Sequence, residues 1–140
     1  MAKRRELWAN LVAPQFGGPV FPVSVQVEVT GTSTDFYPVY VATRDVKIRR
    51  ASFAQEVSPD GTKTLGLANK TDSDALIVTA KTSSGLAADT ASAFTVVDAK
   101  SEWSEGDVIA LHYVCSSAGS TAPGTVTVTM ELEFLELKND

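Results

Sequence analysis

The sequence predicts an all-β protein: a two-sheet antiparallel β-sandwich of jelly-roll type with about eight strands and an extended N-terminal arm. Three observations lead to this prediction. Apolar and polar residues alternate with a period of two in several segments, turn-forming residues separate these segments by roughly 8 to 15 residues, and no helical period follows Pro22. Short strands with this spacing are typical of sandwiches and jelly rolls.

The first three predicted strands carry information about their positions in a sheet. In residues 23–30, valine occupies every second position and polar residues occupy the others, which is the pattern of a half-buried strand. Residues 35–43 contain Pro38, which indicates an edge strand because proline cannot donate a hydrogen bond to a neighbouring strand. In residues 44–57 the apolar phase shifts by one residue after Ile48, as a β-bulge would produce.

The later strands follow a marked turn. Pro59 and Gly61 within residues 58–63 favour a turn, which we expect to join two antiparallel strands. Residues 108–115 are rich in β-branched and aromatic side chains, which favours a central strand. The other predicted strands are residues 64–69, 75–81, 92–98 and 125–138, of which the last is the longest.

The overall composition limits the class of protein. A length of 140 residues suits one domain, and 44% hydrophobic with 21% charged residues is ordinary for a globular chain. No apolar run approaches the roughly 18 residues of a membrane-spanning helix, so we expect no membrane partner. The net charge of -5 argues against a nucleic-acid partner, because phosphates require a basic face. The single cysteine and the interrupted apolar start favour synthesis and retention in the cytoplasm.

Residues 1–22 form the predicted attachment arm, and residues 23–140 form the predicted β-sandwich domain. The arm begins with a basic cluster and continues with apolar residues at helical spacing until Pro14, after which prolines and a glycine pair favour extended chain. A helix this short is marginal in water, so the arm needs a docking surface. The domain's own flank could supply part of that surface, and a neighbouring subunit or a large partner is the easier source. The predicted partner-binding residues are Arg4, Arg5, Leu7, Trp8, Leu11, Val12, Phe16, Val20 and Phe21.

The single histidine and the single cysteine do not predict a catalytic or metal site. His112 and Cys115 lie in the same predicted strand, and one residue of each kind cannot make a zinc site. We expect His112 to be structural or to face outward, and Cys115 to be a buried apolar residue. No cofactor is predicted.

The acidic residues and Trp103 offer only weak alternatives to a structural function. Glu131 and Glu133 share one face of the last strand, where a solvated surface is a simpler interpretation than a catalytic carboxylate pair. Asp72 and Asp74 provide calcium-binding oxygens without the loop length and glutamate of a specific site, so we expect a plain turn. Trp103 is expected in the core or at its rim, although a sugar could stack on it.

One pattern of strands and turns extends over about residues 35–135. It consists of a strand pair with a V-x-I core run, a strand ending in Asn, a turn and strand of the form GDVIAL, and a long alternating last strand. The matching positions are Val46 and Ile48, Asn69, Gly106 to Leu111, and Val126 to Phe134. This pattern resembles a β-sandwich domain common among virion proteins of tailed bacteriophages.

The resemblance implies a non-enzymatic virion structural protein. Proteins of this kind are capsid decoration (cement) proteins, head-fibre bases or other accessory components, usually symmetric oligomers bound to a lattice of major capsid protein. By this resemblance the chain is made in the host cytoplasm and lies on the capsid surface, and its arm binds the major capsid protein or neighbouring copies of the chain, with a trimer favoured. The arm itself lies outside the matched pattern.

Two alternatives stay open. The first is a carbohydrate-binding module that uses the loops at residues 83–90 and 116–124, although these loops contain no aromatic residue for sugar stacking. The second is a receptor-binding or tail accessory domain. A small hydrolase is disfavoured because the sequence offers no catalytic set.

Overall fold

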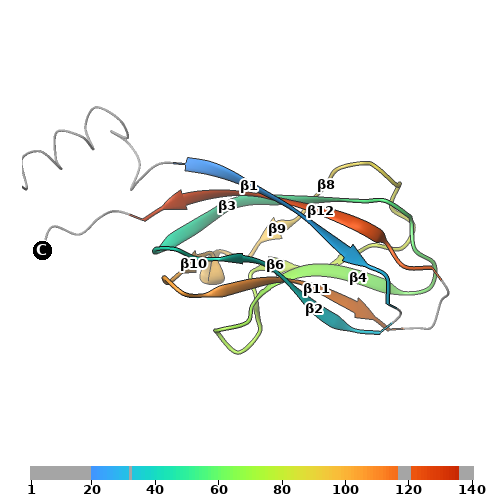
Figure 1. Cartoon of the computed structure of the whole chain (residues 1–140), viewed down its shortest axis with the longest axis horizontal. Helices are drawn as coiled ribbons and strands as arrows, with labels where there is room; N and C mark the ends of the chain where they lie inside the picture. The colour runs from blue at the N-terminus through green and yellow to red at the C-terminus, as the bar shows by residue number, and fades with distance from the viewer. Residues whose placement is uncertain (1–19, 32, 117–120, 136–140) are drawn as a thin grey trace, which may run out of the picture.

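The structure is a computed structural model that describes residues 20–31, 33–116 and 121–135 (Figure 1). One 3-10 turn, η1 (Asp98–Lys100), interrupts an otherwise all-β arrangement in this part of the chain. The strands are β1 (Val20–Val29), β2 (Asp35–Val41), β3 (Val46–Gln55), β4 (Lys63–Asn69), β5 (Ala75–Leu76), β6 (Val78–Thr79), β7 (Lys81–Thr82), β8 (Ser92–Ala93), β9 (Thr95–Val96), β10 (Glu102–Trp103), β11 (Val108–Cys115) and β12 (Gly124–Phe134).

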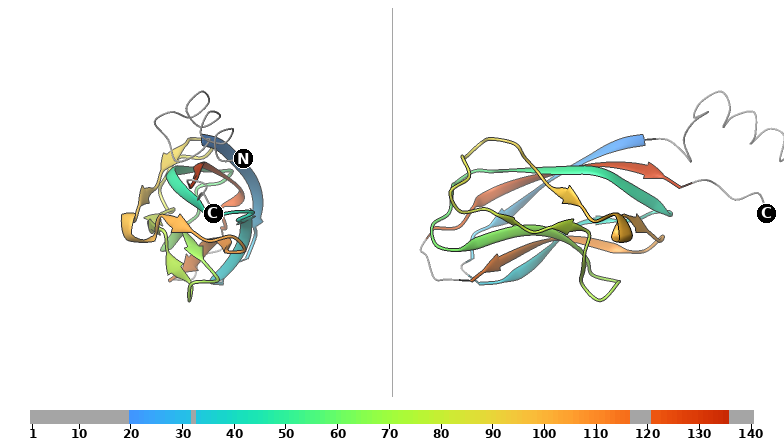
Figure 2. Two further views of the ribbon diagram at one scale, coloured as in Figure 1. Left: turned by 90° about the vertical axis from the view of Figure 1, so that its left-hand side faces the viewer. Right: turned by 180° about the vertical axis from the view of Figure 1, so that it is seen from behind.

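The strands form two main antiparallel sheets, which we call sheet A and sheet B. Sheet A has the order β1-β12-β3-β10, with β8 also paired to β3, and sheet B has the order β2-β11-β4-β5, with β7 also paired to β4. Figure 1 shows their long strands as two facing layers, sheet A above and sheet B below, and Figure 2 shows the same layers from the end and from behind. The predicted two-sheet β-sandwich is therefore confirmed.

The hydrophobic core lies between the two sheets and follows the period of two along each long strand. The inward residues of the two central strands are all fully buried, and they are Val126, Val128, Met130 and Leu132 of β12 and Ile109, Leu111 and Tyr113 of β11. Burial of a large apolar side chain stabilises a fold by roughly 1.5 to 3 kcal/mol. The alternation in the sequence is thus the direct cause of the two-layer arrangement.

Three predictions for individual strands are confirmed. β2, which contains Pro38, is an edge strand of sheet B, and β11 lies inside that sheet between β2 and β4. β3 carries a bulge, because Glu131 of β12 pairs with Arg50 while the next residue pairs with Ile48. Arg49 is the extra residue, and it allows apolar residues on both sides of the bulge to face the core.

β1 begins at Val20, which is three residues before the predicted start of the domain at Val23. Val20, Phe21 and Pro22 pair with residues of β12, so they belong to the sandwich. From the sequence, Pro22 favoured an extended chain that pairs with no other strand. An edge strand tolerates proline, because one side of that strand needs no hydrogen-bond donors.

Two predictions about connections are wrong. The turn at residues 58–63 does not join paired strands, because β3 belongs to sheet A and β4 belongs to sheet B. The predicted strands at residues 75–81 and 92–98 are broken into the short strands β5 to β9. β7 pairs with β4 and β8 pairs with β3, so the chain passes from sheet B to sheet A between them (Figure 2).

Candidate attachment surfaces

Most of the predicted partner-binding residues lie outside the described residues. These are Arg4, Arg5, Leu7, Trp8, Leu11, Val12 and Phe16. The other two, Val20 and Phe21, are the first residues of β1. The structure therefore describes the point at which the arm joins the domain and the surfaces that the domain offers to a partner.

The arm joins the domain at a cluster of two phenylalanines and an arginine. The ring of Phe21 lies 4.5 Å from the ring of Phe134, and the guanidinium carbon of Arg44 lies 4.7 Å from the centre of the Phe134 ring. Contacts of these two kinds each contribute about 0.5 to 1.5 kcal/mol. Phe21 thus packs within its own domain, whereas Val20 is 43% exposed and available to a partner.

An ion pair at the bulge holds the same end of sheet A. Arg49 Nη1 donates to Glu133 Oε1 at 2.9 Å, and the Glu133 side chain is only 9% exposed. Glu131 lies on a more open part of the face, with 3.6 Å between its Oε2 and Arg50 Nε. The predicted solvated pair is therefore wrong for Glu133, which is buried because a bulged arginine pairs with its charge.

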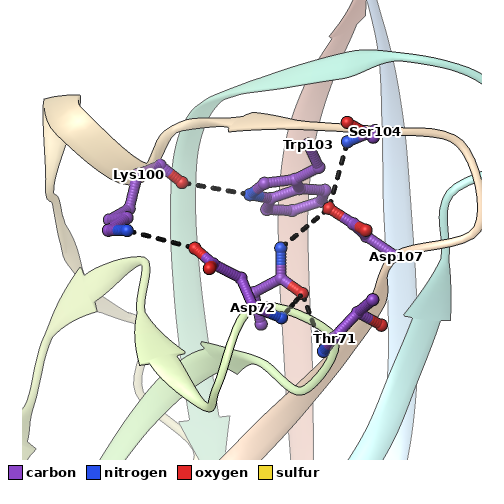
Figure 3. Close-up of polar contacts among 7 residues, drawn as sticks. Thr71, Asp72, Lys100, Trp103, Ser104 and Asp107 are labelled. Carbon is purple, nitrogen blue, oxygen red and sulfur yellow. Dashed lines mark hydrogen bonds and ion pairs between the residues drawn. The ribbon is translucent and has the colours of Figure 1, made fainter.

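A polar network joins the end of β4 to the turn before β11 (Figure 3). Asn69 Nδ2 donates to Asp107 Oδ2 at 2.9 Å, and the same carboxylate oxygen accepts the backbone N–H of Ser104 at 3.0 Å. The Asn69 side-chain oxygen accepts the backbone N–H groups of Thr71 and Asp72 at 3.0 and 3.2 Å. The side chain of one buried asparagine thus makes hydrogen bonds to two loops.

This network explains two separate parts of the sequence pattern, the asparagine that ends a strand and the Gly-Asp turn. Gly106 has φ +91°, a conformation that side-chain-bearing residues rarely adopt, and its N–H donates to the Ala42 carbonyl at 2.8 Å. Thr71 Oγ1 accepts the N–H of Val108 at 3.1 Å. Asn69 and Asp107 are therefore structural residues, and their pairing is a feature that the sequence pattern did not reveal.

Trp103 and the two aspartates of the predicted turn are engaged within the domain. Trp103 is 2% exposed, and its indole N–H donates to the Lys100 carbonyl at 3.3 Å, so the core interpretation of Trp103 is confirmed and its ring is not available to a sugar. Asp72 pairs with Lys100 at 3.1 Å, and Asp74 pairs with Lys70 at 2.8 Å. Among the described residues, no three His, Cys, Asp or Glu side chains are grouped to hold a metal ion.

His112 faces outward from sheet B, which is one of the two roles predicted for it. Its ring stacks on Phe36 with 4.2 Å between ring centres and an interplanar angle of 1°. Burial lowers the pKa of His112, Asp74 opposes this effect, and Lys70 adds to it. Cys115 is half-buried at the end of β11, rather than fully buried as predicted.

The loop that follows β7 is pinned to the core by a buried glutamine. Gln55 Nε2 donates to the carbonyls of Ser83 and Leu86 at 3.0 and 3.1 Å, and the Gln55 carbonyl accepts the N–H of Asp89 at 2.8 Å. Ser83 is itself buried and donates its hydroxyl proton to Gln55 Oε1. These hydrogen bonds therefore hold the loop at residues 83–89 against the sandwich.

The outer faces of the two sheets differ in chemistry. On sheet A, the outward residues of β1 and β12 are mainly hydroxyl-bearing or charged: Ser24, Gln26, Glu28, Thr125, Thr127, Thr129 and Glu131. On sheet B, the outward strand residues carry no carboxylate, ammonium or guanidinium group. They are Phe36, Pro38 and Val41 of β2, Val108, Ala110, His112 and Val114 of β11, Thr64, Gly66 and Ala68 of β4, Leu76 of β5, and Thr82 of β7.

We call this second set the sheet B face. Its centre is closed, because Ala68 and Ala110 are fully buried and Gly66 lies under Ala80 and Leu76, and the exposed side chains around that centre are apolar. Val41 is 54% exposed and Leu76 is 40% exposed. Lys70 reaches across the face, where its Nζ lies 3.8 Å from the centre of the Phe36 ring and is neutralised by Asp74. Sequence reasoning missed this surface because apolar residues on both sides of a strand also indicate a fully buried strand.

No helix in the described residues has the length and apolar character to cross a membrane. A scan against known protein families and a search of curated proteins both find no match to the chain.

A search of solved structures finds similar folds. A chain from the capsid asymmetric unit of cyanophage Pam1 superimposes with a TM-score of 0.56 at 16% sequence identity, over 83% of this chain and 84% of that chain. A chain from the disulfide-linked pili of Bacillus endospore appendages gives a TM-score of 0.44 at 8% identity, over 84% of this chain and 89% of that chain. A chain of infectious bursal disease virus, Gt strain, gives 0.33 at 8% identity, over 84% of this chain and 36% of that chain.

The three structural matches do not support a shared fold equally. The Pam1 match covers most of both chains and shows a fold shared with a chain from a phage capsid. The other two TM-scores are below 0.5, so those two matches do not establish a shared fold. The class defined by the structure is therefore an all-β sandwich of a kind found in a viral capsid.

Proposed function

We propose that the protein is a non-enzymatic structural protein of a virion: a capsid decoration (cement) protein that binds and bridges major capsid subunits through its N-terminal arm. The main support is the fold shared with a chain of a phage capsid asymmetric unit over 83% of this chain. The strand-and-turn pattern of residues 35–135 gives separate support, because it resembles virion proteins of tailed phages. The proposed location is the outer surface of the capsid, after synthesis in the host cytoplasm.

The residues of the arm have the chemistry of an adhesive segment. Within residues 1–19, the large apolar side chains are Leu7, Trp8, Leu11, Val12 and Phe16. Aromatic residues, and tryptophan above all, contribute most to the energy of protein interfaces. An arm of this kind can order itself only where another surface buries those side chains.

The join between arm and domain suits a mechanical link. Val20 and Phe21 are both paired with β12, and Phe21 packs on Phe134, so the arm enters the sheet at the first described residue. A pull on the arm would therefore be carried by β1 into the hydrogen bonds with β12. Many copies on one lattice would add their individual affinities, because each bound arm raises the effective concentration of its neighbours.

The test is deletion of residues 1–19, which leaves β1 intact. We expect the shortened chain to stay folded, with an unchanged far-UV circular dichroism spectrum, and to lose binding to purified capsids that lack the protein. Co-sedimentation of chain with capsids measures the binding. The full-length Trp8→Ala, Leu11→Ala double variant should weaken binding by at least about 100-fold, since each lost anchor contributes roughly 1.5 to 3 kcal/mol.

A matched control comes from the other terminus. Removal of residues 136–140 should leave capsid binding unchanged. Full capsid binding by the chain that lacks residues 1–19 would contradict the role of the arm.

A further inference from the structure

We propose that β1 is an interface between two copies of this chain, which pair their β1 strands antiparallel about a two-fold axis at Gln26 and so join their A sheets into one continuous sheet. The inference goes beyond the proposed function and does not depend on it, because it uses only described residues of the domain. It starts from a long strand that, in the described part of the chain, pairs on one side only, with β12.

The two free edges of the sandwich differ in how they are protected against pairing. Among the described strands, β1 ends sheet A and β2 ends sheet B, and both lie on one side of the sandwich, with η1 on the other (Figure 2). β2 contains Pro38 and a bulge at Val39. β1 pairs with β12 over ten residues without a register shift, and residues 23–29 contain no proline or lysine and one charge, Glu28. Proline, lysine and bulges commonly block edge strands, so β1 is the edge that stays open to a further strand.

The backbone groups that β1 turns outward follow from two hydrogen bonds of β12 and the residue after it. The Thr125 carbonyl accepts the N–H of Glu56 at 2.9 Å, on the side of β3. The N–H of Leu135 donates to the Asp45 carbonyl on the same side at 3.0 Å. Odd-numbered residues of β12 therefore face β3, and its even-numbered residues bond to their odd-numbered partners in β1. The even-numbered residues of β1 thus direct their backbone groups away from the sheet, and Pro22, which lacks an N–H, is one of them.

The hydrophobic core is complete at β12 and incomplete at β1. The core-facing residues in the middle of β12 are fully buried, and they are Val126, Val128 and Met130. Their partners in β1 face the same core but are only partly buried, and they are Val27, Val25 and Val23. A further strand beside β1 would cover this row of valines and bond the free backbone groups at the same time.

The sequence of β1 is complementary to itself when two copies run antiparallel. Residues 23–29 have valine at every odd position and a polar residue at every even position, so the pattern is the same in both directions. With the two-fold axis at Gln26, the two Gln26 side chains face each other. Ser24 faces Glu28 of the second copy, so a hydroxyl lies beside each carboxylate and no two like charges are directly opposite.

The same register suits the backbone and the core side of the strands. The outward-facing residues form three pairs centred on Gln26, which would exchange about six hydrogen bonds, two in each pair. Pro22 lies beyond the last of these pairs, so no donor is missing. On the core side, Val25 faces Val27 of the second copy, and the two partly buried rows cover each other.

A second copy fits this edge better than the N-terminal segment of the same chain. If residues 1–19 folded back along β1 as a hairpin, the turn would fall at the glycine pair before Pro19. Three prolines would then lie in the pairs next to the turn, and they are Pro14, Pro19 and Pro22. Prolines weaken a ladder because they cannot donate, whereas residues 23–29 of a second copy contain none. Two identical strands also form an isologous contact, which closes as a dimer.

The first test places a proline at the centre of the edge, in the full chain. The N–H of residue 26 points away from β12, so Gln26→Pro keeps the pairing with β12 and removes both donors at the two-fold axis. We expect the dissociation constant of the dimer to rise at least about 30-fold. Gln26→Ala keeps the N–H and should raise it less than about 3-fold. Sedimentation velocity over a range of concentrations measures this constant, and thermal unfolding checks that both variants are folded.

The second test uses charge and decides the question if Gln26→Pro does not fold. Gln26→Lys and Gln26→Glu each place two like charges at the two-fold axis, so at low salt each variant alone should dissociate about 10-fold more readily than wild type. An equal mixture of the two should form a dimer at least as stable as that of wild type, because unlike charges then meet. The matched control is Thr129→Lys with Thr129→Glu, on the same face but one strand away from the edge, where charge should have less than about a 2-fold effect.

Deletion of residues 1–19 distinguishes this inference from the proposed function. The shortened chain keeps β1, so the dissociation constant of its dimer should stay within about 3-fold of the wild-type value. The proposed function predicts that the same chain loses capsid binding. Gln26→Pro keeps the arm, so it should lose dimerisation and still co-sediment with capsids.

Four results would overturn the inference. A full chain that stays monomeric at all accessible concentrations would do so if the shortened chain dimerises, because its own N-terminal segment would then occupy the edge. Monomers in both forms would show that the edge does not pair. Undiminished dimerisation of folded Gln26→Pro would place the interface elsewhere. A mixture of Gln26→Lys and Gln26→Glu that associates no better than either variant alone would exclude a two-fold axis at Gln26.

Discussion

The two outer faces of the sandwich differ more than its two inner faces do. Inside, both sheets present alternate apolar side chains to one shared core. Outside, sheet A presents hydroxyls, amides and charges, and it holds Glu133 by an ion pair with Arg49. Sheet B presents Val41, Leu76 and a stacked His112. Folding requires only the inner pattern, so the chemistry of an outer face is free to serve binding.

The comparison separates residues that hold the fold from residues that are free to bind a partner. The end of sheet B is held by the Asn69 network, and the end of sheet A is held by an ion pair and an aromatic cluster. Val41 and Leu76, the large exposed apolar residues of the sheet B face, take part in neither. Substitutions at these places should therefore have effects of different magnitude, and different measurements should detect them.

The largest effect is expected at Asn69. Asn69→Ala removes the acceptor for two backbone N–H groups and the donor to Asp107, in a residue that is 4% exposed. A buried polar group left without its partner costs about 1 to 3 kcal/mol, so we expect the free energy of unfolding to fall by about 3 kcal/mol. Urea denaturation measures this value. Thr129→Ala, on the outer face of sheet A, is the control and should change it by less than about 0.5 kcal/mol.

A smaller effect should distinguish the two glutamates of sheet A. Glu133→Gln breaks the ion pair of a nearly buried carboxylate, and we expect a loss of about 1 to 2 kcal/mol in the free energy of unfolding. Glu131→Gln breaks a longer pair whose arginine is mostly exposed, and we expect less than about 0.5 kcal/mol. If urea denaturation gave the same loss in the free energy of unfolding for both variants, the buried Arg49–Glu133 pair would contribute no more to stability than the exposed pair.

The smallest effect is a pH dependence from the sheet B face. Burial lowers the pKa of His112 in the folded chain below its unfolded value of about 6.5, so the unfolded chain binds the proton more readily. Stability from neutral His112 is therefore present above pH 6.5 and is lost as the pH falls from there towards the lower folded pKa. The melting temperature of wild type should fall more between pH 7.5 and pH 5.5 than that of His112→Gln. A parallel fall in both would exclude His112 as the cause.

The strands were predictable because each records its own surroundings in its sequence. Alternation in residues 23–30 predicted a half-buried strand, Pro38 predicted an edge, and the phase shift after Ile48 predicted the bulge that the structure places at Arg49. These signals depend on neighbours one or two residues away. The extension of β1 to Val20 was missed because Pro22 gives the same signal in an edge strand and in an unpaired segment.

Features that join distant segments were not predictable in the same way. Asn69 and Asp107 lie 38 positions apart, and nothing near either residue indicates that they meet. The passage of the chain between sheets at residues 58–63 has a local turn signal that does not specify which sheet follows. The arm residues before Val20 lie outside the described residues, so their partner stays a proposal.

The sequence by itself determined that this protein is a sandwich, because a period of two can satisfy water and a core only when sheets stack face to face. Only the tertiary structure decided which apolar residues remain outside. Val41 and Leu76 have the same hydrophobicity as core residues, and their exposure depends on strand order, on the bulges and on which segments cover each sheet. Burial is a property of the whole arrangement of strands, so the surface left uncovered can be identified only after the sheets are assembled.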